Sequence, residues 1–228
     1  FATTLLGKIV KFRLIRIKLM LYNDLNLKMC HLNIVFSFSR IFWNCEFYKH
    51  LKMSKLSLPE KKRNIVLVGH MGSGKTTVGK ELAKRTQLKF YDIDKEIEKI
   101  AKKTINKIFE HDGEAKFRKL EEKVSMQILE TKESVIALGG GAFQSNAIRQ
   151  KSIKESICIW LKLDIKSLAE RCELRKNRPL LLNKNIKKEL DKINNVRKSN
   201  FSKSHYIVQV SGKTKYQIAK EIIRIIAN

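Results

Sequence analysis

One stretch of the sequence combines glycines, a lysine and a threonine at a spacing suited to a nucleotide phosphate. It runs Gly69-His70-Met71-Gly72-Ser73-Gly74-Lys75-Thr76 and fits the pattern GxxxxGK[ST]. Gly72 and Gly74 allow the backbone to turn its N–H groups inward around a polyphosphate, where a Cβ would block the approach. The lysine can reach the outer phosphates, and the threonine hydroxyl can ligate a bridging Mg²⁺. We therefore predict a loop that binds a nucleotide polyphosphate together with Mg²⁺.

Two aspartates, Asp92 and Asp94, follow a second predicted strand and could act on a substrate hydroxyl. With one residue between them, both side chains would leave the same face of an extended chain. One carboxylate could hold Mg²⁺ through water, and the other could accept a hydrogen bond or a proton from the hydroxyl. The alternative is that Asp94 caps a helix starting at Lys95, which does not explain the pair.

Two arginines are candidates for binding an acidic substrate. Arg118 lies one helical turn from Glu114 and from Glu121, so surface ion pairs are the simplest explanation. It could instead bind a carboxylate through two hydrogen bonds while Glu121 holds the guanidinium in place. Arg197 lies near the end of a predicted helix, where the helix dipole could equally account for a cation. The spacing leaves these alternatives open.

Two further stretches could contact a ligand. The triplet Gly139-Gly140-Gly141 follows a predicted buried strand, and since two glycines suffice for a turn, a third suggests a bare backbone against which a ligand packs. Farther along, a polar stretch at 175–185 follows another strand and helix. The basic residues in and near it, which could close over phosphates as a lid, are Arg171, Arg175, Lys176 and Arg178.

The candidate residues need elements that bring them together, and the chain from residue 61 onward alternates strands with helices. We predict strands at 65–68, 89–91, 134–138, 156–163 and 206–210. We predict helices at 77–86, 95–102, 113–130, 147–151, 165–174, 186–200 and 215–227. Apolar strands alternating with helices predict a parallel sheet covered on both faces. Ligands bind such sheets at the carboxyl ends of the strands, where the phosphate loop, the aspartates, the glycine triplet and the start of the basic stretch fall.

The charge of the chain narrows the classes of partner. The 228 residues carry a formal net charge of +26, which taken alone would suggest nucleic acid or an anionic membrane. The lysines are spread through every segment rather than gathered in one stripe, so we favour a solvated basic surface that suits anionic ligands. Four cysteines show no CxxC pair and no metal-ligand spacing, which favours reduced thiols in a cytosolic protein. They are Cys30, Cys45, Cys158 and Cys172.

Residues 1–52 differ from the rest, with nine Lys or Arg against two acids and many Leu, Ile and Phe. A transit peptide would be basic and poor in acids but richer in serine. A membrane span would need about 20 consecutive apolar residues, and basic residues interrupt the run too often. The third explanation is that translation begins at Met53. We predict that 1–52 is an extension, disordered or outside the fold, and that 53–228 forms one domain with a lid at about 172–186.

Together these motifs resemble the shikimate kinase family over about residues 61–228. They are the phosphate loop, DxD at 92–94, GExxFRxxE at 113–121, the glycine triplet and RPLL at 178–181. The resemblance implies transfer of the ATP γ-phosphate to the 3-hydroxyl of shikimate, an anionic cyclohexene acid of aromatic amino-acid biosynthesis. It also implies a three-layer P-loop kinase fold, with a five-stranded parallel sheet, helices on both faces and a mobile lid. One departure is Phe201, where the family usually has tyrosine.

The resemblance also implies a role for each matching residue. Those that would contact shikimate, with Arg118 and Arg197 on its carboxylate, are Asp94, Arg118, Gly139, Gly140, Gly141 and Arg197. Those that would contact ATP, with Arg171 on the adenine, are Gly72, Ser73, Gly74, Lys75, Thr76, Thr77, Arg171 and Arg178. Mg²⁺ would be held by Thr76 and, through water, by Asp92. The catalytic residues would be Lys75, Asp94 and Arg178, the last closing onto the transferring phosphoryl group.

Two other functions fit parts of the pattern. One is a P-loop kinase for another small hydroxy acid such as gluconate, against which the paired arginines and the glycine triplet argue. The other is a nucleotide-gated protein that binds nucleic acid through the lysine-rich surface. We predict ATP and shikimate as partners, no nucleic acid, no membrane, and a monomer in the cytoplasm. Organellar import directed by residues 1–52 is a minor alternative.

Overall fold

The computed structural model describes residues 56–173 and 186–227, without the side chains at 171–173 and 186–189. The predicted extension at 1–52 lies outside these ranges, as does nearly all of the predicted lid at about 172–186. The division of the chain into an extension and one domain therefore stays a prediction.

Within the described residues, five parallel strands form the centre of the fold in the order β2-β3-β1-β4-β5. They are β1 (Asn64–Val68), β2 (Lys89–Asp92), β3 (Ser134–Ala137), β4 (Ser156–Lys162) and β5 (Tyr206–Gln209). Every residue of the central strand β1 is buried. Its Ile65 pairs with Val135 on one side and with Ile157 on the other. A continuous apolar strand is stable only with both faces covered, and the predicted parallel sheet is confirmed.

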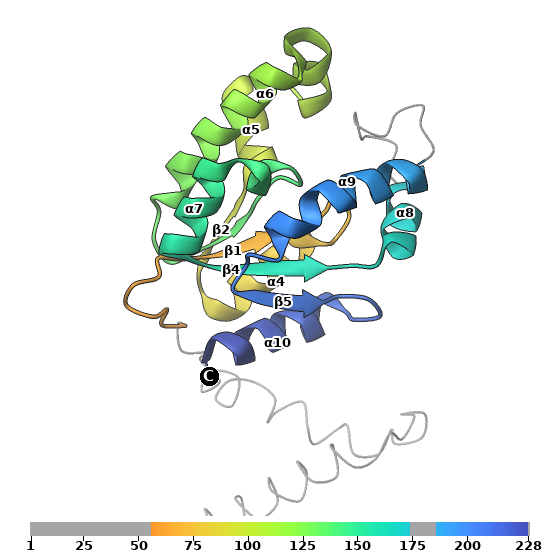
Figure 1. Ribbon diagram of the computed structural model, residues 1–228. Helices are drawn as coiled ribbons and strands as arrows, with labels where there is room; N and C mark the ends of the chain where they lie inside the picture. The colour runs from red at the N-terminus through yellow and green to blue at the C-terminus, as the bar shows by residue number, and fades with distance from the viewer. Residues whose placement is uncertain (1–55, 174–185, 228) are drawn as a thin grey trace, which may run out of the picture. The chain divides into compact units, whose positions relative to one another are not determined.

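Helices cover both faces of this sheet (Figure 1). They are α4 (Lys75–Thr86), α5 (Ile93–Ala101), α6 (Ile105–Leu129), α7 (Asn146–Glu155), α8 (Ile165–Glu173), α9 (Ile186–Phe201) and α10 (Lys215–Ala227), with a short 3₁₀ helix at Ala142–Gln144. Alternate residues of β1 enter two separate cores. Ile65 and Leu67 pack with residues of α4, α8 and α10, whereas Val66 and Val68 pack with residues of α5, α6 and α7. The three-layer arrangement implied by the resemblance is confirmed.

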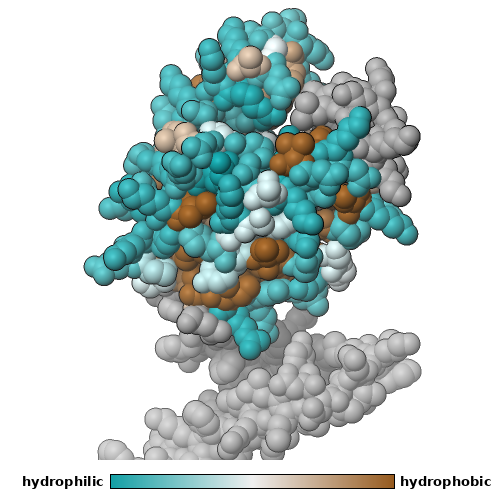
Figure 2. Space-filling view, viewed as in Figure 1, coloured by the Kyte–Doolittle hydropathy of each residue, from teal (hydrophilic) through white to brown (hydrophobic). Residues whose placement is uncertain are grey.

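The outer surface of the visible face is largely hydrophilic (Figure 2). Hydrophobic residues form several separate areas on that face rather than one continuous sheet of apolar surface. In the described ranges, no helix combines the length and the apolar character that crossing a membrane requires. The hydrophilic character of the visible face agrees with the solvated surface inferred from the sequence.

Two element boundaries differ from the prediction, and both affect the site. Helix α5 begins at Ile93, so Asp92 closes β2 while Asp94 lies in the first helical turn. The expectation that both aspartates leave one face of a strand is therefore wrong, because the alternation of side chains ends where the helix starts. The alternative is also wrong, since Asp92 occupies the N-cap position of α5 and its side chain makes no capping bond.

Helix α6 is bent at Gly113, which explains the second difference. We predicted a helix from Gly113, but α6 already begins at Ile105 and continues past the glycine. Gly113 has φ 78° and ψ 166°, a backbone conformation open almost only to glycine. A Cβ there would meet no atom within 4 Å, so the backbone and not the packing requires glycine. The bend divides α6 into two arms, one before and one after Gly113. The ring centroids of Phe109 and Phe117, one on each arm, lie 4.6 Å apart, so the two arms pack against each other.

Replacing Gly113 should cost stability through the backbone alone. We expect Gly113→Ala to lower the free energy of unfolding by about 1–3 kcal/mol, measured by urea denaturation. Lys119→Ala, at an exposed position of the same helix, is the control and should change it by less than about 0.5 kcal/mol. Equal stability of the two variants would show that alanine adopts the backbone conformation of Gly113 without a cost in free energy.

Candidate active site

The loop between β1 and α4 has the geometry of a phosphate cradle. Gly72 and Gly74 adopt positive φ values of 80° and 95°, as the pattern predicted. The first glycine has a separate reason, because a Cβ at Gly69 would lie 2.7 Å from the carbonyl oxygen of Leu161 in β4. Lys75 donates from Nζ to the carbonyl oxygens of Gly69 and His70, each at 2.8 Å. The lysine ammonium is therefore held beside the loop, at the N-terminus of α4, where an anion is favoured.

A cavity of about 390 Å³ opens above this loop. Its walls include the predicted nucleotide residues Gly72, Ser73, Gly74, Lys75, Thr76 and Thr77, together with Asp92, Asp94 and Gly140. Lys213, which precedes α10, and Lys215, the first residue of α10, also line it and were not among the predicted residues. Lys213 pairs with Glu221 at 2.7 Å. In a chain this rich in lysine, no local signal distinguishes these two from the others.

The side chains of Thr76 and Asp92 fit the predicted magnesium site. Thr76 Oγ1 donates to Asp92 Oδ2 at 2.6 Å, and both residues line the cavity above the loop. Residues 56–173 and 186–227 contain no cluster of three or more His, Cys, Asp or Glu side chains that could hold a metal ion. Mg²⁺ in phosphoryl-transfer sites takes only one or two protein oxygens and completes its shell with phosphates and water. One hydroxyl beside one carboxylate meets that requirement.

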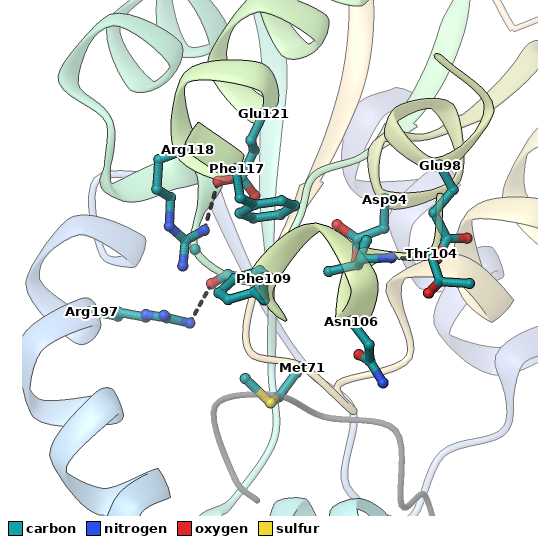
Figure 3. A pocket seen from close by; sticks show the side chains of 13 residues that line it. Met71, Asp94, Glu98, Thr104, Asn106, Phe109, Phe117, Arg118, Glu121 and Arg197 are labelled. Carbon is teal, nitrogen blue, oxygen red and sulfur yellow. Dashed lines mark hydrogen bonds and ion pairs between the residues drawn. The ribbon is translucent and has the colours of Figure 1, made fainter. Parts of the chain in front are cut away.

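A second cavity, of about 310 Å³, has two arginines, an aspartate and two phenylalanines in its wall (Figure 3), and we call it the acid cavity. Its predicted wall residues are Asp94, Arg118, Gly140, Gly141 and Arg197. Glu121, predicted to hold the Arg118 guanidinium, also lines it, and the wall residues that the sequence analysis missed are Met71, Glu98, Thr104, Ile105, Asn106, Phe109 and Phe117. Both arms of the bent helix α6 contribute, since Phe109 and Phe117 stand on opposite sides of Gly113. The cavity therefore combines cations, an aspartate and an aromatic surface.

The glycine triplet lets three side chains of the site approach one stretch of backbone. A Cβ at Gly139 would collide with Glu121 Oε1 and lie 2.9 Å from Asp94 Oδ1. A Cβ at Gly141 would lie 2.6 Å from Arg118 Nη1. Gly140 and Gly141 line the acid cavity. Gly139, the third predicted glycine, is not in that wall. The bare backbone predicted from the sequence thus makes room for side chains of the site, and its contact with a ligand stays a prediction.

Arg118 is held by two glutamates and still faces the cavity. Its Nη1 donates to Glu121 Oε2 at 2.7 Å, and its Nη2 to Glu114 Oε1 at 2.9 Å. Burial works against the charged guanidinium, but Glu121 and then Glu114 outweigh it, so the pKa of Arg118 is raised. Burial also raises the pKa of Glu121, which is 3% exposed, and the guanidinium opposes that rise. Arg118 thus forms the ion pairs of the first alternative and also lines the cavity, as the second alternative, binding of a substrate carboxylate, requires.

Arg197 is a buried cation of a different kind, 8% exposed. Its Nη1 donates to the carbonyl oxygen of Gly140 at 2.8 Å. Among residues 56–173 and 186–227, no carboxylate forms an ion pair with it. Burial, and then the charge of Arg118, lower the pKa of Arg197. The charges of Glu121 and Glu114 oppose this lowering from beyond ion-pair distance. A buried guanidinium that forms no ion pair within the described residues favours an anionic ligand, and two neighbouring guanidinium groups suit a carboxylate.

The two cavities adjoin, because Met71, Asp94 and Gly140 belong to the walls of both. A nucleotide on the loop and an acid on the arginines would therefore meet at Asp94. A parallel sheet with a phosphate loop and an adjoining acid pocket defines a P-loop phosphotransferase that acts on a small acid. Two predicted residues cannot be placed in it, since Arg178 and the side chain of Arg171 lie outside the described residues.

Comparison with known proteins identifies the family. The family profile described as "Shikimate kinase" matches residues 71–227. Shikimate kinase of Persephonella marina is 40% identical over 161 residues, which are 71% of this chain and 97% of that protein. Shikimate kinase of Bartonella quintana is 38% identical over 167 residues, 73% of this chain and 80% of that protein. The structure of shikimate kinase from Acinetobacter baumannii in complex with shikimate is 34% identical, with a TM-score of 0.71, and the match covers 74% of this chain and 94% of that one.

The chain belongs to the shikimate kinase family. Its reaction is the ATP-dependent phosphorylation of shikimate, and the resemblance drawn from the motifs is confirmed. The relatives reported above all carry the name shikimate kinase, which decides against the alternative of a gluconate kinase.

His70, inside the phosphate loop, is a buried residue that no local pattern marked. It is 3% exposed, and its Nε2 lies 3.0 Å from Asn194 Oδ1 in a hydrogen bond. Burial lowers the pKa of His70 from its ordinary 6.5 to about 4. The bond to Asn194 opposes this shift, whereas the charges of Arg197 and Lys75 add to it. The imidazole is therefore neutral at neutral pH.

Protonation of His70 should destabilise the fold in mild acid. The unfolded chain takes up this proton near pH 6.5 but the folded protein only near pH 4. The contribution is thus complete above pH 6.5 and is lost as the pH falls toward 4, by on the order of 3 kcal/mol in total. We expect the free energy of unfolding to fall across this window more steeply in the wild type than in His70→Gln. His111→Gln, at an exposed histidine, should keep the wild-type slope; equal slopes in all three proteins would contradict the assignment.

Proposed function

We propose that phosphoryl transfer from ATP to the 3-hydroxyl of shikimate takes place where the two cavities meet. The observation that carries this proposal is the shared wall of Met71, Asp94 and Gly140. An acid bound to the arginines would present its ring hydroxyl to the end of a triphosphate lying on the loop. The Acinetobacter baumannii relative, whose structure is a complex with shikimate, supports the choice of acid.

Arg118 and Arg197 bind the carboxylate of shikimate in this proposal. Arg118 is oriented by its 2.7 Å bond to Glu121, and Arg197 by its 2.8 Å bond to the carbonyl oxygen of Gly140. The substrate carboxylate supplies the negative charge that the buried Arg197 lacks. Phe109 and Phe117 give the cyclohexene ring an apolar surface beside these charges.

Asp94 accepts the hydrogen bond of the 3-hydroxyl and takes its proton as the reaction proceeds. The hydroxyl oxygen forms a bond to the γ-phosphorus while the bond from that phosphorus to the bridging oxygen of ADP breaks. The electrons of the broken bond leave with ADP, and the proton passes from the hydroxyl to the Asp94 carboxylate. In a loose transition state of this kind the protein mainly positions the groups and neutralises charge.

The phosphates of ATP are bound by the loop between β1 and α4. Backbone N–H groups of residues 72–77 and the ammonium of Lys75 bind the phosphates, with α4 directed at them. Thr76 and Asp92 would hold Mg²⁺, which would supply positive charge against the phosphates. Arg171 on the adenine and Arg178 on the transferring phosphoryl group complete the proposal on sequence grounds alone.

The remaining assignments are proposals of the same kind. We propose that the enzyme acts as a monomer in the cytoplasm, that it does not use nucleic acid as a partner, and that residues 53–228 form the catalytic domain. Size-exclusion chromatography of the full chain tests the first of these, because a mass near twice 26.5 kDa would indicate a dimer.

ADP release measured in a coupled assay tests the function directly. The protein with ATP and Mg²⁺ should release ADP quickly only when shikimate is added. We expect Lys75→Ala to lower turnover by about 10³-fold or more, because the lysine stabilises charge that develops on the phosphates in the transition state. Lys80→Ala, at an exposed position of α4, should keep wild-type turnover. ADP release indifferent to shikimate in the wild type would refute the proposed reaction.

Arg118→Lys tests the acid pocket, since it keeps the charge but loses the paired hydrogen bonds of a guanidinium. Hydrogen bonds to charged groups are worth about 1.5–3 kcal/mol, so we expect the shikimate KM to rise by roughly 10- to 100-fold. The KM for ATP and the turnover number should change much less, because the contact exists before the transition state. Arg224→Lys, on the exposed side of α10, should change neither KM. An unaltered shikimate KM in Arg118→Lys would remove Arg118 from the pocket.

A further inference from the structure

A buried hydrogen bond that the mechanism above does not use joins the phosphate loop to α9. It runs between His70 and Asn194, residues 124 positions apart in the chain. The carbonyl oxygen of the same His70 accepts the bond from Lys75 Nζ at 2.8 Å. One residue therefore contacts both the lysine that binds phosphate and the helix that carries Arg197.

The loop and α9 are also connected by a second route. Asn194 precedes Arg197 by three residues, so the two side chains lie on neighbouring parts of one helix face. Arg197 bonds to the carbonyl oxygen of Gly140, and a Cβ on Gly140 would lie only 3.2 Å from the backbone nitrogen of Met71. The phosphate loop is thus linked to α9 in two ways. His70 bonds directly to Asn194, and Met71, the next residue of the loop, packs against Gly140, which accepts the bond from Arg197.

The His70 ring has little freedom to move. The ring of Phe201, at the end of α9, meets it edge to face at 5.1 Å and is itself fully buried. Since Asn194 Oδ1 accepts, the ring hydrogen lies on Nε2; His70 Nδ1 has no hydrogen-bond partner within the described part of the chain. Loss of the Asn194 amide would therefore leave the buried imidazole without its side-chain hydrogen bond, which is costly.

We propose that His70 and Asn194 are positioning residues that hold Arg197, and with it the substrate carboxylate, at a set distance from the phosphate loop. This inference rests on the proposed function. Neither residue lines the acid cavity, so both act through Arg197. The carboxylate and the 3-hydroxyl of shikimate are attached to one six-membered ring, so a shift at the carboxylate also displaces the hydroxyl. Transfer needs the reacting atoms about 3–3.5 Å apart, and a displacement of about 1 Å can cost 10²-fold.

Asn194→Leu tests this role, with Asn195→Leu as the matched control one exposed position along the same helix. We expect kcat/KM for shikimate to fall on the order of ten-fold or more in Asn194→Leu. The dissociation constant of a fluorescent ADP analogue should stay within roughly two-fold, because the phosphate loop itself is unchanged. Asn195→Leu should match the wild type in both measurements. Equal kcat/KM in the two variants would overturn the inference.

A double-mutant cycle separates positioning from a general loss of packing. His70→Leu and the double variant His70→Leu/Asn194→Leu should lose about as much kcat/KM as Asn194→Leu alone, since each removes the same bond. His70→Gln keeps an N–H donor and should recover much of what His70→Leu loses. Losses that simply add, or a His70→Gln as impaired as His70→Leu, would overturn the inference.

The outcomes also distinguish this inference from the function on which it rests. A wild-type protein without shikimate-dependent ADP release would refute the proposed function. A fully active wild type together with an Asn194→Leu variant that behaves like Asn195→Leu would refute only the role of the His70–Asn194 pair.

Discussion

The desolvation of Arg197 is the constraint around which the acid pocket is organised. Removing a guanidinium from water costs several kcal/mol unless nearby groups compensate for it. In the described part of the chain, Arg197 is 8% exposed and donates to a single carbonyl, that of Gly140. Arg118 beside it has two glutamates. The pocket therefore contains one cation that protein carboxylates neutralise and one that forms no ion pair within the described residues, and in the proposed function the substrate carboxylate neutralises the second.

The glycine triplet follows from the same constraint. Three charged side chains must approach one short segment of backbone, and the space that a Cβ would occupy is taken by Glu121 and Asp94 at Gly139 and by Arg118 at Gly141. At Gly140 the neighbour is the phosphate loop itself. Any Cβ on this segment would therefore press on a side chain of the site or on the phosphate loop.

Two predictions about the site were right about the residues involved but wrong about the secondary structure that positions them. Asp92 and Asp94 were expected side by side at the end of a strand, yet the chain turns into α5 between them. Both still line the nucleotide cavity, since the carboxyl end of β2 and the first turn of α5 face the loop. The first arm of α6 was missed because Gly113 looks like a helix start, and only its bend, closed by Phe109 against Phe117, explains a helix on both sides.

The sequence by itself determined the phosphate loop, the alternation of strands and helices, the parallel sheet and the family, because these depend on local sterics, on periodicity and on motif spacing. Only the tertiary structure decided that Arg118 is paired with a glutamate whereas Arg197 bonds to a backbone carbonyl. It also decided that Lys213 and Lys215 line the cavity above the phosphate loop and that His70 bonds to Asn194. These features join residues far apart in the chain, and their energies depend on burial. A local pattern can indicate that an apolar strand is buried, but it does not show which polar or charged side chains are buried or which distant group each one meets.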